Sequence, residues 1–283
     1  MIHLGLIGYP LEHSLSPKIH TAALNACGLK GDYSLFPIYP DDKQGLRDLL
    51  ARVRTNEIHG LNVTIPHKQN VIPLLDELAP TAKAIGAVNT ILVKDGKLIG
   101  HNTDAPGFLG DLQRCFPTLQ KLGIALVLGA GGAARAVVSA LLSDGWQVTL
   151  AVRPADVGQV EGLISSFNQD GLRHFVLMTV EGLTPLLKGT KLIVNATPLG
   201  MSPASETCPW PEDLPLPSGV AVYDCVYNPR ETLLVKRARA AGLPAETGLG
   251  MLLEQAALAF EIWTGHNPSR NILFDSVGST RPD

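Results

Sequence analysis

One segment of the chain constrains its fold more than any other, because an apolar strand leads into a glycine-rich turn and then into a helix. An apolar run over residues 124–128 is followed by Gly129-Ala130-Gly131-Gly132-Ala133-Ala134, a helical stretch to about residue 143, and a second apolar run over 147–152. The turn matches G-x-G-x-x-G/A, with Ala134 at the third small position. A strand, turn, helix and second strand in this order predict a βαβ unit.

The glycines of this turn have a specific use if the unit binds a dinucleotide. Gly129 permits the tight turn after the strand, and Gly131 allows a pyrophosphate to approach the backbone. The N–H groups and the dipole at the start of the helix then hold the anion. Any strand-to-helix turn can use glycines structurally, but with both strands and the helix in place the dinucleotide site is the favoured interpretation.

The end of the second strand distinguishes NADP from NAD. An acidic residue for the adenosine ribose is expected about 20 residues after the glycines. Here the chain reads Ala151-Val152-Arg153-Pro154, with no carboxylate before Asp156. The planar guanidinium of Arg153 suits a 2′-phosphate. The sequence therefore favours NADP, although a surface arginine in a loop explains Arg153 equally well when it is considered alone.

The rest of the chain alternates apolar runs with helical patterns, which is typical of an α/β fold with largely parallel strands. A length of 283 residues exceeds the usual size of one domain, so two are expected. Pro37 favours an edge position for its strand, Asp95-Gly96 predicts a hairpin, and Ser16 is expected to cap a helix. We expect the tail after Leu273 to be mobile. Further strands are expected over 4–8, 33–39, 60–65, 90–93, 97–100, 174–178, 191–195 and 220–224, and helices over 16–27, 42–54, 104–115 and 248–264.

Charge and cysteine content argue against several classes of function. The formal net charge is −3 and no run of like charges occurs, which disfavours nucleic acid or an anionic membrane as the main partner. No segment approaches the roughly 20 apolar residues of a membrane span, and the first residues do not resemble a signal peptide. The cysteines form no C-x-x-C pair, so we expect reduced thiols in a cytoplasmic protein, without a zinc site or disulfide framework. They are Cys27, Cys115, Cys208 and Cys225.

Seven further segments are not explained by the fold class. They are Ser14-Leu15-Ser16-Pro17, Asn62-Val63-Thr64-Ile65-Pro66-His67-Lys68, Gly86-Ala87-Val88-Asn89-Thr90, Asn102-Thr103-Asp104-Ala105-Pro106-Gly107, Asn195-Ala196-Thr197-Pro198-Leu199-Gly200-Met201, Tyr223-Asp224-Cys225-Val226-Tyr227-Asn228-Pro229, and Gly250-Met251 with Gln255. Any one of them could arise by chance. Together, their order and spacing closely resemble the shikimate dehydrogenase family over nearly the whole chain.

The resemblance implies a fold and an activity. The implied domains are an N-terminal substrate-binding domain (1–103), a Rossmann-like NADP-binding domain (104–240), and a C-terminal helical segment (241–283) that packs on the first domain. Members of this family interconvert 3-dehydroshikimate and shikimate with NADP(H), on the route to aromatic amino acids. We therefore expect an oxidoreductase acting on a CH–OH group, with cofactor and substrate meeting between the domains. Both a monomer and a homodimer are compatible with the sequence.

The same resemblance implies site residues by position. Lys68 and Asp104 form the implied catalytic pair. Ser14 and Ser16 are implied to donate hydrogen bonds to the substrate carboxylate, with Tyr227 nearby. The residues implied to fix the ring hydroxyls are Thr64, Asn89 and Gln255. The residues implied to contact the cofactor are Gly129, Ala130, Gly131, Gly132, Ala133, Arg153, Thr197, Gly200, Met201 and Gly248.

The chemistry accounts for an ammonium group paired with a carboxylate. Oxidation of a secondary alcohol needs a base for the hydroxyl proton, and reduction of the ketone needs a proton-donating or positively charged partner at its oxygen. Lys68 would contact the reacting oxygen, while Asp104 would hold the lysine and share the proton. We assign the proton transfer to the pair rather than to Lys68 alone.

Each site residue has a simpler explanation when it is taken alone. A lysine is usually a solvated surface residue, and Asp104 could be a helix cap. His13, His20 and His67 have no metal-ligating partners at suitable spacing, so we interpret them as structural or exposed. Only the joint occurrence of the segments in the family's order favours the functional roles.

The sequence departs from the family beside Arg153, and other functions stay open. Many NADP-using members have Asn-Arg-Thr and a further basic residue downstream, whereas this chain has Val152-Arg153-Pro154 and then Val157. We therefore expect a weaker hold on the 2′-phosphate and leave NAD open as a second cofactor. The alternatives are the same chemistry on quinate or an aminoshikimate-type compound, and a nucleotide-binding regulator without catalysis. Retention of Lys68 and Asp104 argues against the regulator.

Overall fold

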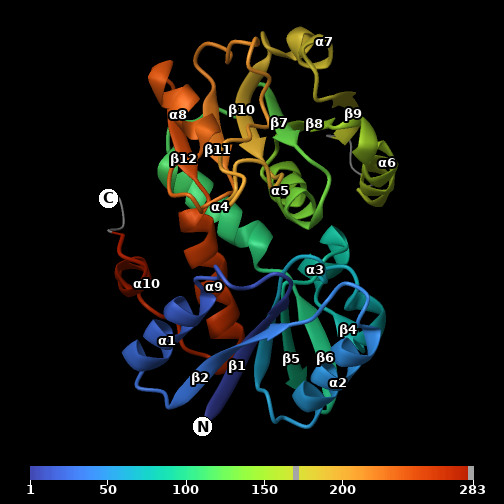
Figure 1. Ribbon diagram of the computed structural model, residues 1–283, viewed down its shortest axis with the longest axis vertical. Helices are drawn as coiled ribbons and strands as arrows, with labels where there is room; N and C mark the ends of the chain where they lie inside the picture. The colour runs from blue at the N-terminus through green and yellow to red at the C-terminus, as the bar shows by residue number, and fades with distance from the viewer. Residues whose placement is uncertain (168–171, 280–283) are drawn as a thin grey trace. The chain divides into compact units, whose positions relative to one another are not determined.

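The computed structural model of the protein describes residues 1–167 and 172–279. The chain divides into two compact units, of which the first comprises residues 1–103 and 253–283 and the second residues 104–252. Each unit is built around one six-stranded sheet with helices between its strands (Figure 1). The α/β class expected from the sequence is confirmed.

The first unit contains a mixed sheet with the strand order β2-β1-β3-β5-β6-β4. Its strand β1 pairs in parallel with both neighbours, while β5 is antiparallel to β3 and to β6. The predicted edge strand and the predicted hairpin at Asp95-Gly96 are both confirmed. The strands are β1 (Ile2–Gly8), β2 (Gly31–Pro37), β3 (Gly60–Val63), β4 (Glu77–Leu78), β5 (Thr90–Lys94) and β6 (Lys97–His101).

Helices of the first unit bury apolar side chains against its core. The helix predicted over 42–54 occurs as α2, whose buried residues form an apolar stripe at i, i+3, i+4 and i+7, namely Leu46, Leu49, Leu50 and Val53. They join one core with strand residues such as Leu61. Burial of each such side chain contributes roughly 1.5–3 kcal/mol to folding. The helices are α1 (Ser16–Ala26), α2 (Lys43–Arg54), α3 (Pro80–Ile85), α10 (Arg270–Ser276) and the larger part of α9 (Leu249–Thr264).

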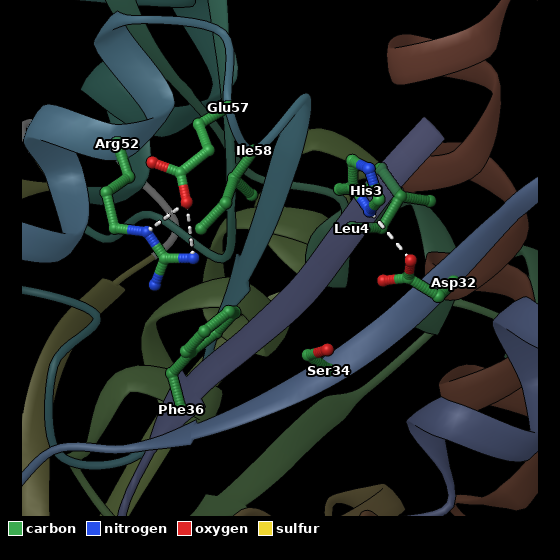
Figure 2. A pocket seen from close by; sticks show the side chains of 8 residues that line it. All are labelled: His3, Leu4, Asp32, Ser34, Phe36, Arg52, Glu57 and Ile58. Atoms are coloured by element: carbon green, nitrogen blue, oxygen red, sulfur yellow. Dashed lines mark hydrogen bonds and ion pairs between the residues drawn. The ribbon is translucent and has the colours of Figure 1, made fainter. Parts of the chain in front are cut away.

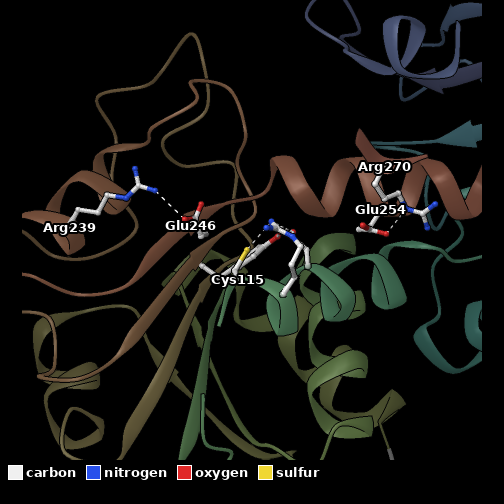
Figure 3. A network of polar contacts seen from close by, with 8 residues as sticks. Cys115, Arg239, Glu246, Glu254 and Arg270 are labelled. Atoms are coloured by element: carbon white, nitrogen blue, oxygen red, sulfur yellow. Dashed lines mark hydrogen bonds and ion pairs between the residues drawn. The ribbon is translucent and has the colours of Figure 1, made fainter. Parts of the chain in front are cut away.

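Two local expectations for the first unit are wrong. Ser16 does not cap α1, because the helix begins at Ser16 and Leu15 is the residue before it; the Ser14 hydroxyl accepts a hydrogen bond from the Ser16 N–H at 3.2 Å. The tail after Leu273 was expected to be mobile, but helix α10 continues to Ser276 and buries Leu273 and Phe274. An Arg270–Glu254 ion pair, with 2.8 Å between Nε and Oε2, ties α10 to α9 (Figure 3).

The second unit contains an entirely parallel sheet with the strand order β9-β8-β7-β10-β11-β12. Strands β7, β8 and β9 follow one another towards one edge of the sheet. The chain then returns to place β10 on the other side of β7, and β11 and β12 continue towards the opposite edge. This is the doubly wound order of dinucleotide-binding folds, whose ligand crevice lies at the carboxyl ends of the two strands where the order reverses. The strands are β7 (Ile124–Leu128), β8 (Gln147–Val152), β9 (Leu172–Leu177), β10 (Thr190–Asn195), β11 (Ala221–Asp224) and β12 (Ala245–Thr247).

Crossover helices connect the parallel strands of the second unit. They are α5 (Gly132–Ser143), α6 (Val157–Ser166), α7 (Val180–Leu183) and α8 (Leu233–Ala240), and α4 (Asp104–Cys115) precedes the sheet. The predicted βαβ unit is present as β7, α5 and β8. Residues 241–252 differ from the expected C-terminal segment on the first domain, because β12 adds a strand to the second sheet and the first turn of α9 belongs to that unit.

No helix among residues 1–167 and 172–279 is both long and apolar enough to cross a lipid bilayer.

His20 is fully buried in the first unit, which is unusual for a histidine. Its ring stacks on Tyr33, with 4.4 Å between ring centroids and 3° between ring planes. Neither ring nitrogen has a hydrogen-bonding partner among the described residues. Burial lowers the pKa of His20 to about 3, an effect that the nearby Asn62 side chain opposes. The imidazole therefore stays neutral in the folded protein at ordinary pH.

This burial should make stability depend on pH. The unfolded chain takes up a proton on His20 below pH 6.5, whereas the folded protein does so only near pH 3, so stability falls as the pH drops through this window. The loss should be about 1.4 kcal/mol per pH unit. Between pH 7.5 and 5, His20→Phe should lose roughly 2 kcal/mol less unfolding free energy than the parent, as measured by urea denaturation. The exposed His266→Phe serves as control, and a parent-like pH dependence in His20→Phe would refute the explanation.

Candidate active site

Four predicted substrate residues follow the carboxyl ends of neighbouring strands in the first unit. Ser14 and Ser16 follow β1, and Thr64 and Lys68 follow β3, its parallel neighbour. The backbone N–H of Thr64 donates to the Ile7 carbonyl at 2.8 Å, so the β3 loop begins beside the end of β1. Parallel strands therefore bring the two loops to the same edge of the sheet.

Asn89 joins three segments that are distant in sequence. Its buried side chain is 2% exposed, and its Nδ2 donates to Thr103 Oγ1 at 2.9 Å and to Gln255 Oε1 at 3.2 Å. Its Oδ1 accepts from the Thr103 N–H at 2.8 Å. The Val88 N–H donates to the Lys68 carbonyl at 2.8 Å, which ties the Lys68 backbone to the residue before Asn89. The structure thus brings the predicted residues Lys68, Asn89 and Gln255 into one neighbourhood.

A chain of buried polar groups connects this neighbourhood to Ser16. The Tyr33 hydroxyl donates to Asn62 Oδ1 at 2.7 Å, and Asn62 Nδ2 donates to the Asn89 carbonyl at 3.2 Å. Burial raises the pKa of Tyr33 well above its usual value, and a hydrogen bond with the Ser16 hydroxyl opposes that rise. Sequence reasoning did not single out Tyr33, because a tyrosine in an expected edge strand carries no signal of this link.

Asp104 and Tyr227 belong to the second unit. Asp104 is the first residue of α4 and is buried, and Tyr227 is half-buried in the loop after β11. Burial raises the pKa of the Tyr227 hydroxyl. Lys68, by contrast, is half-buried in the first unit, so the predicted catalytic pair draws one residue from each unit.

The glycine turn lies at the point where the strand order of the second sheet reverses. Gly129 has φ +109°, and an added Cβ would lie 2.9 Å from Thr197 Cγ2, so the turn after β7 touches the loop after β10. At Gly131 an added Cβ would meet no protein atom within 4 Å. Packing therefore does not require glycine at Gly131, so the backbone there is open to close approach. The start of α5 at Gly132 and Ala133 presents N–H groups that have no partners within the helix.

The loop after β10, which contains the predicted cofactor residue Thr197, is held by a buried carboxylate. Asp224 Oδ1 accepts from Asn195 Nδ2 at 2.8 Å, and Asn195 Oδ1 accepts from both the N–H and the hydroxyl of Thr197. The Thr232 hydroxyl donates to Asp224 Oδ2 at 2.7 Å. Burial raises the pKa of Asp224 to about 6, although these hydrogen bonds oppose the shift. Asp224 and Thr232 were not among the predicted site residues, and they hold Thr197 only through Asn195.

The remaining predicted cofactor residues have different surroundings. Gly200 has φ +88°, which favours glycine, and Met201 is exposed. An added Cβ at Gly248 would lie 2.2 Å from the Cys225 carbonyl oxygen, so packing alone requires glycine there. Ala130 is buried in the turn.

Arg153 lies directly after β8, the strand beside β7. The Gly129 N–H donates to the Ala151 carbonyl at 2.8 Å, which ties the end of β8 to the glycine turn. Arg153 is two residues beyond Ala151 in the chain. Its guanidinium makes two hydrogen bonds to Asp156, from Nε to Oδ2 at 2.7 Å and from Nη2 to Oδ1 at 3.3 Å. Arg153, the residue predicted to bind the 2′-phosphate, is therefore paired with an acidic side chain.

A cavity of about 230 Å³ lies away from these residues, beside β1, β2 and the last turns of α2 (Figure 2). Its charged lining is already paired, with 2.7 Å between His3 Nδ1 and Asp32 Oδ2 and 2.8 Å between Arg52 Nη2 and Glu57 Oε1. None of the predicted site residues lines it. The cavity gives no support for a second catalytic centre.

Cysteine and metal chemistry find no support in the described residues. Burial, reinforced by Asp111, raises the pKa of Cys115 to about 12, so its thiol stays protonated, although the Arg114 guanidinium that donates a hydrogen bond to its sulfur opposes the rise (Figure 3). None of the four cysteines, all of them among the described residues, forms a disulfide. Over residues 1–167 and 172–279, no group of three or more His, Cys, Asp or Glu side chains is arranged to hold a metal ion.

Comparison with known proteins gives matches along nearly the whole chain. Residues 6–91 match the family described as shikimate dehydrogenase substrate binding domain, and residues 248–272 match the shikimate 5′-dehydrogenase C-terminal domain. The NADP(+) shikimate dehydrogenase of Salinibacter ruber is 40% identical over 276 residues, covering 96% of this chain and 95% of the relative.

Solved structures agree with these matches. Shikimate 5-dehydrogenase from Thermus thermophilus, in complex with NADP(H) and shikimate, has a TM-score of 0.85 and 38% identity, with 98% of each chain covered. Quinate dehydrogenase from Corynebacterium glutamicum, in complex with NAD, has a TM-score of 0.86 and 33% identity, again with 98% of each chain covered.

Removal of the Tyr33 hydroxyl should test the buried chain of polar groups. Tyr33→Phe leaves Asn62 Oδ1 without its donor in a buried position, so the free energy of unfolding should fall by about 1–2 kcal/mol. Chemical denaturation measures the loss. Tyr39 is 59% exposed, and Tyr39→Phe should change stability by less than about 0.5 kcal/mol. Equal effects of the two substitutions would contradict the importance of the Tyr33–Asn62 bond.

Proposed function

This chain belongs to the shikimate dehydrogenase family, and we propose from that membership that it catalyses the reversible NADP(H)-dependent interconversion of 3-dehydroshikimate and shikimate. It is thus an oxidoreductase acting on a CH–OH group. The observation that carries the proposal is the polar neighbourhood of Lys68, Asn89 and Gln255 in the first unit. Two amide side chains bonded to each other, beside the backbone of a lysine, suit a small ligand with several hydroxyls and a carboxylate.

We assign substrate binding to the first unit and cofactor binding to the second. Ser14 and Ser16 donate hydrogen bonds to the substrate carboxylate, which forms shorter and stronger hydrogen bonds than a neutral acceptor does. We assign Tyr227 to the same carboxylate, and Thr64, Asn89 and Gln255 to the ring hydroxyls. The network around Asn89 fixes both amides before the substrate arrives, which reduces the entropy lost on binding.

The residues around the glycine turn fit a dinucleotide. Gly131 leaves space at the backbone for a pyrophosphate, and the N-terminus of α5 attracts its charge. Gly129 to Ala133 hold the phosphates, Arg153 the 2′-phosphate, and Thr197, Gly200, Met201 and Gly248 the nicotinamide end. When bound, NADP supplies the hydride for reduction or accepts it in oxidation.

Lys68 and Asp104 carry the proton transfer. During reduction the Lys68 ammonium group stabilises the negative charge that builds on the carbonyl oxygen, and the pair delivers the proton that completes the hydroxyl. During oxidation the pair removes that proton while hydride leaves the same carbon. We assign the proton to the two residues jointly, so both are required for either direction.

The proposal includes location and assembly. Four cysteines without a disulfide suit a reducing compartment, which supports a cytoplasmic enzyme. A small-molecule substrate needs no macromolecular partner, and the protein acts as a monomer or a homodimer.

A direct assay tests the activity. Purified protein is mixed with shikimate or quinate and with NADP⁺ or NAD⁺, and the absorbance of the reduced nicotinamide is followed. Shikimate with NADP⁺ should give the highest kcat/KM. A preference for quinate would replace the substrate but keep the chemistry, because a quinate dehydrogenase is among the similar structures. Absence of turnover with every pair would overturn the proposal in favour of a nucleotide-binding regulator.

Lys68→Ala should abolish most of the turnover. Loss of the proton-transfer and charge-stabilising group should lower kcat by about 100-fold or more, while the dissociation constant of NADP⁺ stays the same. Steady-state kinetics and calorimetry measure the two quantities. Lys83→Ala, at an exposed position of α3, is the matched control. A Lys68→Ala enzyme with near-normal kcat would remove Lys68 from the mechanism.

Arg153→Ala should discriminate between the two cofactors. The substitution removes the group that pairs with the 2′-phosphate, so KM for NADP⁺ should rise by about tenfold or more, with a smaller change for NAD⁺. Kinetics at saturating shikimate give both values. Equal losses for the two cofactors would reject the assignment of Arg153.

A further inference from the structure

The pairing of Arg153 with Asp156 is the feature of the second unit that the proposed function leaves unexplained. Both donors on one edge of the guanidinium, Nε and Nη2, are bonded to the two carboxylate oxygens of Asp156. The backbone closes the same short turn, because the Asp156 N–H donates to the Arg153 carbonyl at 2.9 Å. Residues 154–156 form a 3-10 turn, which sets the side chains three residues apart on one side.

Helix capping does not account for the position of the Asp156 carboxylate. Asp156 is the residue before α6, where an aspartate commonly accepts hydrogen bonds from the first N–H groups of the helix. Here its side chain makes no such bond. Its oxygens accept hydrogen bonds from Arg153 instead. The Asp156 side chain is 18% exposed and the Arg153 side chain is 51% exposed. An ion pair this exposed contributes little to stability.

We propose that Asp156 competes with the 2′-phosphate of NADP for Arg153 and thereby sets the preference of this chain between NADP and NAD. The inference rests on the proposed function, because it requires a dinucleotide whose adenosine ribose lies at the end of β8. It names the residue that determines cofactor specificity, whereas Arg153 alone would bind the phosphate without opposition.

The competition follows from the donors and charges that are present. A phosphate and a carboxylate both accept from the same fork of the guanidinium, so a 2′-phosphate must displace Asp156 or share Arg153 with it. It must also approach a second negative charge at close range, which is unfavourable. The 2′-hydroxyl of NAD has neither problem, because a hydroxyl can donate to a carboxylate at this position. Asp156 therefore weakens NADP binding and supports NAD binding.

The surrounding sequence increases the effect of this one carboxylate. The residues that flank Arg153 are Val152 and Pro154, and Val157 follows Asp156, so no second cation lies in this stretch to offset the charge of Asp156. Arg153 is thus the single cation of residues 152–157, and its availability is controlled by its neighbour three residues away.

Asp156→Asn tests the competition, because it removes the charge while keeping the size of the side chain. The dissociation constants of NADP⁺ and NAD⁺ are measured by calorimetry on the full chain, so the result does not depend on turnover. The ratio Kd(NAD⁺)/Kd(NADP⁺) should rise by about fivefold, with tighter NADP⁺ binding as the main change. Asp144→Asn is the matched control, because Asp144 also pairs with one exposed cation, Lys121, but lies at the end of α5 that is remote from the glycine turn.

The outcomes separate the inference from the proposed function. An unchanged ratio in Asp156→Asn, or the same rise in Asp144→Asn, would overturn the inference while leaving shikimate oxidation by the parent protein intact. The substitution is also made in the Arg153→Ala protein, where the gain in NADP⁺ affinity should largely disappear. A full gain without Arg153 would show that Asp156 does not act by occupying that arginine. Failure of the parent to oxidise shikimate would overturn the proposed function alone.

Discussion

The hydrogen bonds of the Asn89 side chain are the interaction on which the first unit's polar neighbourhood depends. A buried amide must have its donors and acceptor paired, because each unpaired group costs about 1–3 kcal/mol. Asn89 meets this requirement by binding Thr103 and Gln255, which lie on separate segments of the chain. The same bonds therefore stabilise the fold and fix the position of the two amides to which we assign the ring hydroxyls of the substrate. The second unit uses a similar device, since Asn195, held by Asp224, fixes Thr197 beside the glycine turn.

Preorganisation of this kind leaves few groups to be ordered when a ligand binds. The loops after β1 and β3 begin at the edge of a sheet whose strands are almost fully buried there, and the turn after β7 begins in the same way. Loops on a rigid sheet can place polar side chains accurately, whereas their own sequences have little tendency to form one conformation. Asp224 shows the cost of such an arrangement. Its carboxylate is buried deeply enough to raise its pKa to about 6, and it accepts hydrogen bonds from Asn195, Val226 and Thr232.

The fold could be predicted from the sequence wherever the apolar period was long enough to define an element. The strands and helix of 124–152, the stripe of α2 and the hairpin at Asp95-Gly96 all occur as expected. The two-residue β4 and three-residue β12 are too short to show an alternation of apolar and polar residues. Because β12 pairs with the second sheet, residues 241–252 belong to a different unit from the one expected. Ser-Pro is a common helix start and predicts a cap at Ser16, whereas α1 already includes Ser16. The sequence could not reveal Tyr33 as a partner of Asn62, since cross-strand neighbours depend on register.

Arg153 illustrates why the preference for NADP or NAD is harder to predict from the sequence than the cofactor-binding fold is. The glycine turn occurs where its spacing predicts, between β7 and α5. The affinity of an arginine for phosphate depends instead on which other acceptors reach the guanidinium, and an aspartate three residues away does so only because the chain turns tightly at Pro154. A single basic residue therefore indicates a 2′-phosphate site without fixing its strength. In this chain the nearest acidic side chain, rather than the arginine, decides how much of that affinity is available.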